Sequence, residues 1–208
     1  MEILKTITTA LFLSLFFLNQ SVNAQINQKI IDAFAESYKL EKKGEFKKAA
    51  DALKQVYDPK SYEINLRLGW LNYQAGLFTE SSTHYKRAVD LMPYSEEAKF
   101  GLIYPKAAIG KWDEVINIYN QILKIHPQNT IANYRLGLIY YGRKDYEKAE
   151  TYFKKVVNLY PFGYDGLIML AWTEFQLGKF REAKILFYKV LLYNPDDASA
   201  KDGLSRIK

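Results

Sequence analysis

The apolar residues of this chain recur every three or four positions, in segments that short polar turns separate. Ile30, Ile31, Phe34 and Tyr38 form the first such stripe, and a break at Gly44 separates it from a second one. Spacing of this kind indicates amphipathic α-helices, and a glycine between two of them indicates a turn. We therefore predict an all-α chain of paired helices, or αα-hairpins.

Prolines mark the period of this pattern. Five of the six prolines stand 34 residues apart (for example 93 − 59 = 34), and they are Pro59, Pro93, Pro127, Pro161 and Pro195. A period of 34 residues indicates a helical repeat array. The sixth, Pro105, falls inside a predicted helix, four residues after Gly101. Because glycine gives the backbone slack there, we predict a kink of this helix rather than its loss.

The period divides the chain after residue 24 into repeats. In chain order these are an irregular first hairpin at 25–61, aligned repeats at 62–95, 96–129, 130–163 and 164–197, and a capping helix at 198–208. We number the positions of each aligned repeat from 1 to 34 and call them places. Place 8 carries Gly69, Ile103, Gly137 and Ala171, and place 24 is always aromatic. Small residues let two helices approach closely, and large residues fill the gaps beside them. Asp197 is expected to cap the last helix.

The repeat at 130–163 resembles the tetratricopeptide repeat family. The family pattern W-x2-L-G-x2-Y…A-x3-F-x2-A…P is matched there by Leu136, Gly137, Tyr140, Ala149, Phe153 and Pro161. The resemblance implies a right-handed α-solenoid of stacked αα-hairpins, with about five repeats and a C-terminal capping helix. Place 4, usually a large apolar residue in the family, holds Asn65, Lys99 and Asn133, and only Leu167 conforms. We expect neighbouring apolar residues to supply the packing instead.

We call the two helices of each repeat its first and second helix. The same resemblance implies a concave groove, lined by places 2, 5, 9 and 12 of the first helices. Eight of the twelve residues at places 5, 9 and 12 are aromatic. The candidate partner-binding residues are Glu63, Arg67, Trp70, Tyr73, Phe100, Tyr104, Tyr134, Arg135, Tyr141, Trp172 and Phe175. Place 9 is the most informative, because Trp70, Tyr104 and Trp172 stand where the family commonly has a small polar residue. Glu63 and Arg67 can also pair as i,i+4 neighbours.

Exposed aromatic rings give large contact area at small entropy cost. We therefore predict a non-enzymatic protein interaction scaffold of the cell envelope that holds an extended or helical segment of a protein partner. An alternative of another class is a carbohydrate-binding or polysaccharide-handling module, in which the same rings stack on sugars. A third interpretation is a spacer whose rings only fill the scaffold.

Residues that carry catalytic chemistry are scarce. The chain has no cysteine, which excludes disulfides and thiolate metal sites, and its two histidines, His84 and His126, lie in different repeats, where we expect structural or surface roles. There is no glycine-rich phosphate loop. We predict no enzymatic activity, no cofactor and no metal. The net charge of +6 comes with lysines spread over the second helices, which favours a solvated outer face rather than nucleic-acid binding.

The first 24 residues have the features of a signal peptide. Lys5 precedes a nine-residue apolar run at 10–18, and Ala24 ends a polar segment with a small residue. We predict cleavage between Ala24 and Gln25, because the apolar run is far shorter than the roughly 20 residues of a transmembrane helix. Cleavage removes one base and one acid, so the mature charge remains +6 (28 − 22). The chain is thus expected in a bacterial periplasm or secreted, without a membrane span after cleavage.

Overall fold

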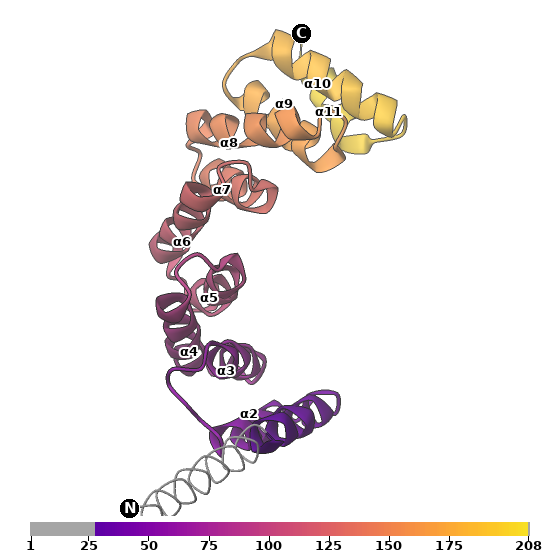
Figure 1. Ribbon diagram of the computed structural model, residues 1–208. Coiled ribbons are helices and arrows are strands. Elements are labelled where there is room, and N and C mark those ends of the chain that lie inside the picture. Colours follow the sequence, from indigo (N-terminus) through magenta and orange to yellow (C-terminus); the bar gives the residue numbers. More distant parts are fainter. Residues whose placement is uncertain (1–27, 208) are drawn as a thin grey trace, which may run out of the picture. The chain divides into compact units, whose positions relative to one another are not determined.

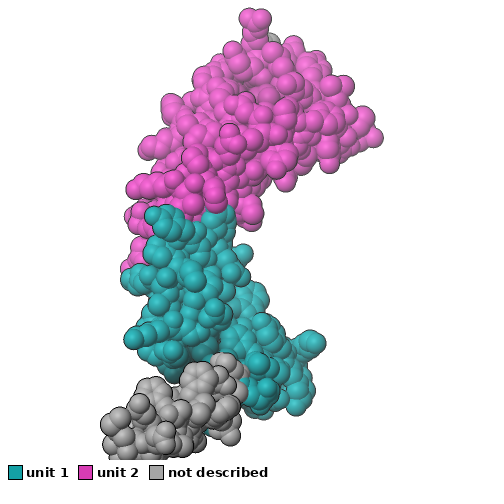
Figure 2. Space-filling model, in the orientation of Figure 1, with its two compact units in different colours: residues 1–110 teal, residues 111–208 magenta. Residues whose placement is uncertain are grey.

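The computed structural model describes residues 28–207, in which α-helices are joined by short turns (Figure 1). The predicted signal peptide, residues 1–24, lies outside these described residues. The chain divides into two compact units, Met1–Gly110 and Lys111–Lys208 (Figure 2). Within residues 28–207, no helix combines the length and the apolar character that crossing a membrane requires.

The first unit is built of antiparallel helices that pack on their neighbours in the chain. Residues 28–41 are helical. The helices that follow in this unit are α2 (Phe46–Lys54), α3 (Tyr62–Gln74), α4 (Phe78–Leu91) and α5 (Glu96–Ala108). Helix α3 contacts α2 and α4, and α5 contacts both α4 and α3. First helices therefore lie beside one another in the stack.

The second unit continues the same pattern. Its helices are α6 (Trp112–Ile125), α7 (Thr130–Gly142), α8 (Tyr146–Leu159), α9 (Tyr164–Gln176), α10 (Phe180–Tyr193) and α11 (Ala198–Arg206). Helices α7 and α8 form one hairpin, α9 and α10 form the next, and α11 packs on α10 and α9. The prediction of an all-α fold of stacked hairpins is confirmed.

Local sequence fixes where the first helices begin. Ser61 precedes α3, and its Oγ accepts a hydrogen bond from the backbone N–H of Ile64 at 3.2 Å. Asp197 precedes α11 and accepts in the same way from Ala200 at 2.8 Å, so the predicted cap is confirmed. Such caps satisfy backbone donors that a helix start leaves unpaired, and each stabilises by about 1 kcal/mol.

Within a core of mostly aliphatic residues, several aromatic rings pack against glycines of facing helices. Phe153 of α8 is fully buried, and a Cβ on Gly137 of α7 would lie 2.6 Å from its ring. Phe187 of α10 is also fully buried, and a Cβ on Gly203 of α11 would lie 2.3 Å from that ring. Both distances are far below ordinary contact, so the missing side chains are what let the helices approach.

Tyr85 of α4 makes this contact with two first helices. A Cβ on Gly69 of α3 would lie 2.7 Å from the Tyr85 ring, and one on Gly101 of α5 would lie 2.1 Å from it. Gly101 is therefore required for packing. This role adds to the backbone freedom that we expected it to give before Pro105. Helix α5 continues through Pro105, so the helix is retained as predicted.

Buried polar side chains at place 4 tie first helices to the preceding turn. Asn65 donates from Nδ2 to the carbonyl oxygens of Pro59, at 3.2 Å, and of Ser61, at 2.7 Å. Asn133 makes the same two kinds of bond in its own repeat. Lys99 donates to the carbonyl of the corresponding proline, and burial lowers the pKa of its ammonium group. This role of place 4 was not predicted from the sequence.

Two carboxyl groups and two lysines join α8, α9 and the start of α10. Glu174 is 2% exposed, while Lys179 Nζ lies 2.7 Å from both carboxylate oxygens of Glu150, which also pairs with Lys154. Burial raises the pKa of Glu174, and the neighbouring Glu150 raises it further. Burial also acts to raise the pKa of Glu150, but hydrogen bonds from Lys154, Lys179 and Glu174 outweigh it and lower the value to about 2.

The ring-to-glycine contact is tested by Gly137→Ala. The added methyl group must displace the Phe153 ring, so we expect the free energy of unfolding to fall by about 1–3 kcal/mol. Gly142→Ala is the matched control, because nothing lies within 4 Å of a Cβ at that end of the same helix. There we expect no loss, and a gain of up to about 1 kcal/mol from helix propensity. Equal effects of the two changes in urea unfolding would contradict the packing argument.

The buried carboxyl group predicts a pH dependence that Glu174→Gln removes. Because the folded pKa of Glu174 lies above its ordinary value of 4.5, its stabilising contribution is full below about pH 4.5 and is lost as the pH rises through the folded pKa. We expect Glu174→Gln to gain stability relative to the wild type as the pH rises from 4.5 to 7.5. The gain increases with the distance of the folded pKa above its ordinary value, because each pH unit of a pKa shift corresponds to about 1.4 kcal/mol.

The contribution of Glu150 has the opposite sign. It is present above about pH 4.5 and is lost only as the pH falls towards 2, so it stays constant in the tested range. The measurement is urea unfolding of both proteins at several pH values. A stability difference that is the same at pH 4.5 and 7.5 would show that Glu174 does not titrate in that range.

Candidate functional site

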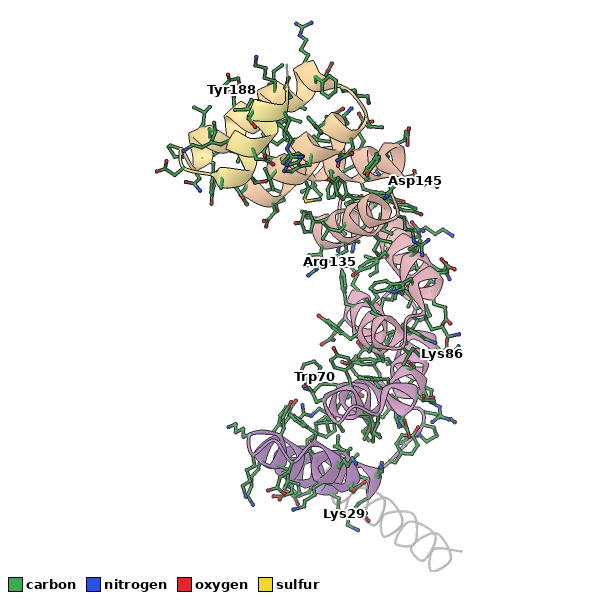
Figure 3. The ribbon with its side chains drawn as sticks, turned by 180° about the vertical axis from the view of Figure 1, so that it is seen from behind. Lys29, Trp70, Lys86, Arg135, Asp145 and Tyr188 are labelled. Carbon is green, nitrogen blue, oxygen red and sulfur yellow. The ribbon has the colours of Figure 1, made fainter. Side chains whose placement is uncertain are left out.

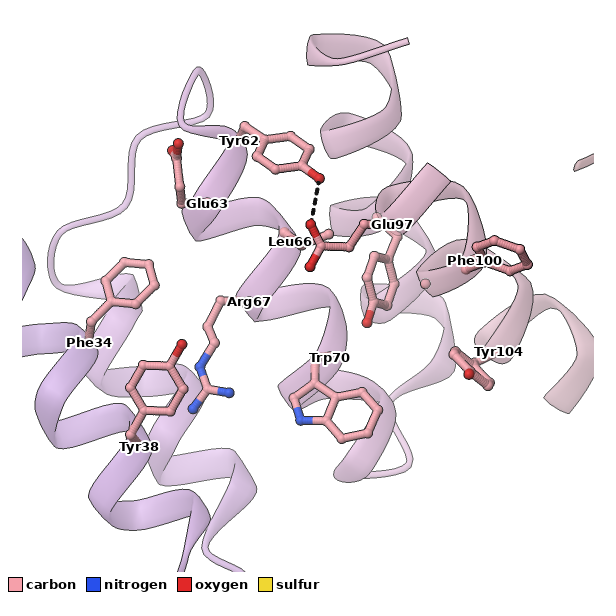
Figure 4. Close-up of a pocket in the computed structure, with 12 residues that line it drawn as sticks. Phe34, Tyr38, Tyr62, Glu63, Leu66, Arg67, Trp70, Glu97, Phe100 and Tyr104 are labelled. Carbon is pink, nitrogen blue, oxygen red and sulfur yellow. Dashed lines mark hydrogen bonds between the residues drawn. The ribbon is translucent and has the colours of Figure 1, made fainter. Parts of the chain in front are cut away.

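A cavity of about 590 Å³ opens in the first unit, between residues 28–41 and helices α3 and α5 (Figure 4). Its volume is within the range of about 300–1,000 Å³ that ligand sites occupy. Five of the eleven candidate groove residues line it, namely Glu63, Arg67, Trp70, Phe100 and Tyr104. Repeat periodicity therefore brings together residues that lie on two successive first helices.

Glu41 fixes one wall of this cavity. Its carboxylate accepts a hydrogen bond from Arg67 Nη2 at 2.6 Å and another from Trp70 Nε1 at 2.6 Å. The Arg67 guanidinium also lies 3.8 Å from the centre of the Tyr38 ring. Burial acts to raise the pKa of Glu41, but the bonds from Arg67 and Trp70 outweigh it and hold that pKa below its usual value. The charge of Arg67 is thus compensated, and its side chain is held in place.

Two exposed carboxylates stand at the rim. Glu63 accepts a hydrogen bond from Ser61 Oγ at 3.0 Å. Arg67 pairs with Glu41 instead of forming the i,i+4 pair with Glu63 that the sequence permits. Glu97 accepts a hydrogen bond from the Tyr62 hydroxyl at 3.3 Å (Figure 4). Within residues 28–207, no basic side chain pairs with either carboxylate. Both negative charges therefore remain open to a ligand.

Aromatic rings form a continuous face beside these groups. The Tyr73 ring centre lies 6.2 Å from that of Trp70 and 5.5 Å from that of Tyr104. Tyr73 also packs on Phe78, the first residue of α4, at 5.7 Å. Tyr104 is 51% exposed. Phe78 thus supports the ring face through Tyr73, and Tyr104 is the ring that faces solvent.

The place 9 tryptophan of the second unit has a different environment. Trp172 donates from Nε1 to Ser199 Oγ of α11 at 2.8 Å, and its ring packs edge-on against Phe187 at 5.1 Å. Phe175 contacts Trp172 at 5.5 Å and Phe180 at 5.4 Å. These two candidates therefore pack within the last hairpin and its capping helix.

The three remaining candidates also lie in the second unit. Tyr134 packs on Phe153 at 5.9 Å, and Tyr141 packs on Tyr146 at 5.4 Å. Arg135 is exposed on α7 (Figure 3). Place 12 aromatics thus pack on the first residue of the following helix in both units, and this packing explains their presence without a ligand.

Several residues of the cavity were not among the predicted site residues. They are Phe34, Tyr38, Tyr62, Tyr85 and Gly101, together with Glu41 behind the wall. Leu66 and Glu97 also line the cavity, and they stand at places 5 and 2, which the family resemblance puts in the groove. Glu41 carries no such signal, since it ends the irregular first helix.

Catalysis and metal binding depend on polar side chains that converge on one point. Within residues 28–207, no cluster of three or more His, Cys, Asp or Glu side chains could hold a metal ion. His84 is half-buried, with Nδ1 3.2 Å from Asn65 Oδ1 and its ring edge-on to Tyr57. Burial lowers the pKa of His84. This environment fits the structural role expected for His84 from the sequence.

Known proteins of similar sequence or structure include tetratricopeptide repeat proteins. A 22% identical tetratricopeptide repeat protein from Parabacteroides merdae covers 86% of this chain and 72% of its own, with a TM-score of 0.72. The crystal structure of a MamA protein, 24% identical, covers 83% of this chain and 95% of its own, with a TM-score of 0.70. Protein O-mannosyl-transferase Tmtc3 of Drosophila melanogaster is 26% identical over 53% of this chain, but the match spans only 12% of that protein.

Models of one repeat family match three parts of the chain. They cover residues 34–96, 131–162 and 164–197, and each is a model of the tetratricopeptide repeat. The first match includes most of the irregular first hairpin and of the cavity. The chain belongs to the tetratricopeptide repeat family.

Proposed function

We propose that this protein is a non-enzymatic scaffold that holds a segment of a protein partner in the cavity of its first unit. Tetratricopeptide repeats generally mediate protein–protein interactions, which supports the choice of partner class. The observation that carries the proposal is the connected ring face of Trp70, Tyr73 and Tyr104, beside fixed polar groups. Rigid aromatic anchors next to oriented polar groups are typical of binding hot spots.

The proposed place of action is the cell envelope or the extracellular space. Support comes from the sequence of residues 1–24, with its short apolar run and the small residue Ala24 at its end. The absence of cysteine is compatible with an oxidising compartment, because no thiol is at risk there. After cleavage, the partner would be a protein of the same compartment.

Tyr104→Ala tests the binding role of the cavity. Tyr104 is half exposed, so its loss should change the free energy of unfolding by less than about 1 kcal/mol. Loss of a central aromatic anchor should weaken partner binding about tenfold or more. The measurement is affinity capture with crosslinking from the protein's own cells, followed by titration of the captured partner.

Tyr188→Ala is the matched control, because Tyr188 on α10 is 52% exposed and lies outside the cavity (Figure 3). Partner binding should survive this change. Equal retention by both variants would reject the cavity as the binding site and favour a spacer. Saturable changes of tryptophan emission with cell-wall oligosaccharides, without capture of any protein, would support the carbohydrate-binding alternative.

The predicted export is tested on the expressed full-length chain. We expect the mature protein to begin at Gln25, as N-terminal sequencing of protein from the periplasm or medium will show. Replacing Leu13 and Leu15 with Lys shortens the apolar run and should keep the precursor inside the cell. A chain that starts at Met1 in the soluble internal fraction would contradict the compartment that we propose.

A further inference from the structure

We infer that the cavity of the first unit accepts a positively charged side chain, lysine or arginine, from the partner segment. This inference rests on the proposed function, because it names the chemistry of the partner at the same cavity. Three features of the cavity carry it. They are the balance of charge around it, the aromatic faces beside that charge, and an unpaired hydroxyl group in its lining.

The charge balance is negative. Glu63 and Glu97 line the cavity and have no basic partner within residues 28–207. The one basic side chain among its lining residues, Arg67, is 2.6 Å from Glu41 and is stacked on Tyr38. Glu41, behind the wall, compensates the one guanidinium, which leaves the two negative charges of Glu63 and Glu97 in the lining. A cationic ligand gains from this excess, and an anionic ligand meets repulsion.

Aromatic faces add to this preference. Trp70, Phe100 and Tyr104 line the cavity next to the carboxylates. A lysine or arginine side chain can lay its aliphatic part on such rings while its charged end reaches the carboxylates. The ring faces also attract cations directly. An uncharged aliphatic side chain would gain only the apolar contact with the rings.

Tyr85 supplies a polar group within the lining. This residue is 4% exposed, and its ring is fixed between Gly69 and Gly101. Within residues 28–207, the Tyr85 hydroxyl makes no hydrogen bond, and its oxygen is not fully enclosed. Burial and nearby Glu97 raise the pKa of Tyr85, so the group stays a neutral hydroxyl. Its oxygen can accept a hydrogen bond from an ammonium or guanidinium group.

The chain as a whole has the opposite charge. Its net charge is +6, so the average field of the molecule repels cations. A local excess of carboxylate beside aromatic rings is therefore a feature of this cavity and does not follow from overall composition. This contrast also gives the experiment its control, because local and overall charge can be changed separately.

The test is selection of short random peptides against the mature chain, followed by affinity measurements. We expect the selected peptides to be enriched in Lys and Arg, and to bind about ten times more weakly when that residue becomes Met. The double variant Glu63→Gln, Glu97→Gln should show a similar loss of about tenfold for the Lys or Arg peptides. It should bind the Met versions as the wild type does.

The matched control is Glu147→Gln, Asp165→Asn, which makes the same change of overall charge in the second unit. This control variant should weaken peptide binding less than about twofold, and salt should reduce even that effect because it screens the overall charge. Equal losses in both double variants would overturn the inference, because overall charge would then explain them. Peptides that depend on Tyr104 but show no enrichment in Lys or Arg would overturn the inference and leave the proposed function standing. Failure to select any Tyr104-dependent peptide would overturn both.

Discussion

The contact between a buried aromatic ring and a glycine on a facing helix sets the spacing on which this structure depends. Tyr85 contacts Gly69 and Gly101, and Phe153 contacts Gly137. Because these rings occupy the space of missing side chains, neighbouring helices approach closely enough to exclude water from the apolar residues around them. One hairpin cannot bury enough surface alone, so stacking completes each core. Rings that make this contact are committed to the fold, although Tyr85 also reaches the lining of the cavity. Residues on the open side of the first helices are free to serve binding.

The environment of a repeat position depends on what stacks next to it. Trp70 and Trp172 both stand at place 9. The indole of Trp70 donates to Glu41 and borders a cavity, while that of Trp172 donates to Ser199 of the capping helix and rests on Phe187. Periodicity therefore places both rings on a first helix, but the adjacent helix decides whether a ligand can reach them. Binding capacity in such an array is consequently a property of neighbouring repeats rather than of one repeat.

Local sequence predicted most of the fold, because its causes are local. The proline period gave the hairpins, and Asp197 caps α11 through the residue three positions later. The site was predicted only in part, since its causes are distant in sequence. Glu41 lies 26 and 29 residues from its two partners, in a hairpin that does not follow the repeat. Asn65 shows a different limit. Its amide bonds the carbonyl of Pro59, only six residues earlier, but the direction of a turn carbonyl cannot be read from residue types. The export signal lies outside the described residues and stays a prediction.

Glu41 also determines which charge the cavity presents. A guanidinium among aromatic rings would ordinarily be expected to attract a carboxylate or phosphate. Here the Arg67 guanidinium is already engaged by Glu41 at 2.6 Å and is covered on one face by Tyr38. An anionic ligand would compete with the Glu41 carboxylate for the guanidinium, and it would also meet the negative charge of Glu63 in the lining. One carboxylate behind the wall thus compensates Arg67 and leaves Glu63 and Glu97 to set the charge preference of the cavity, which favours cations.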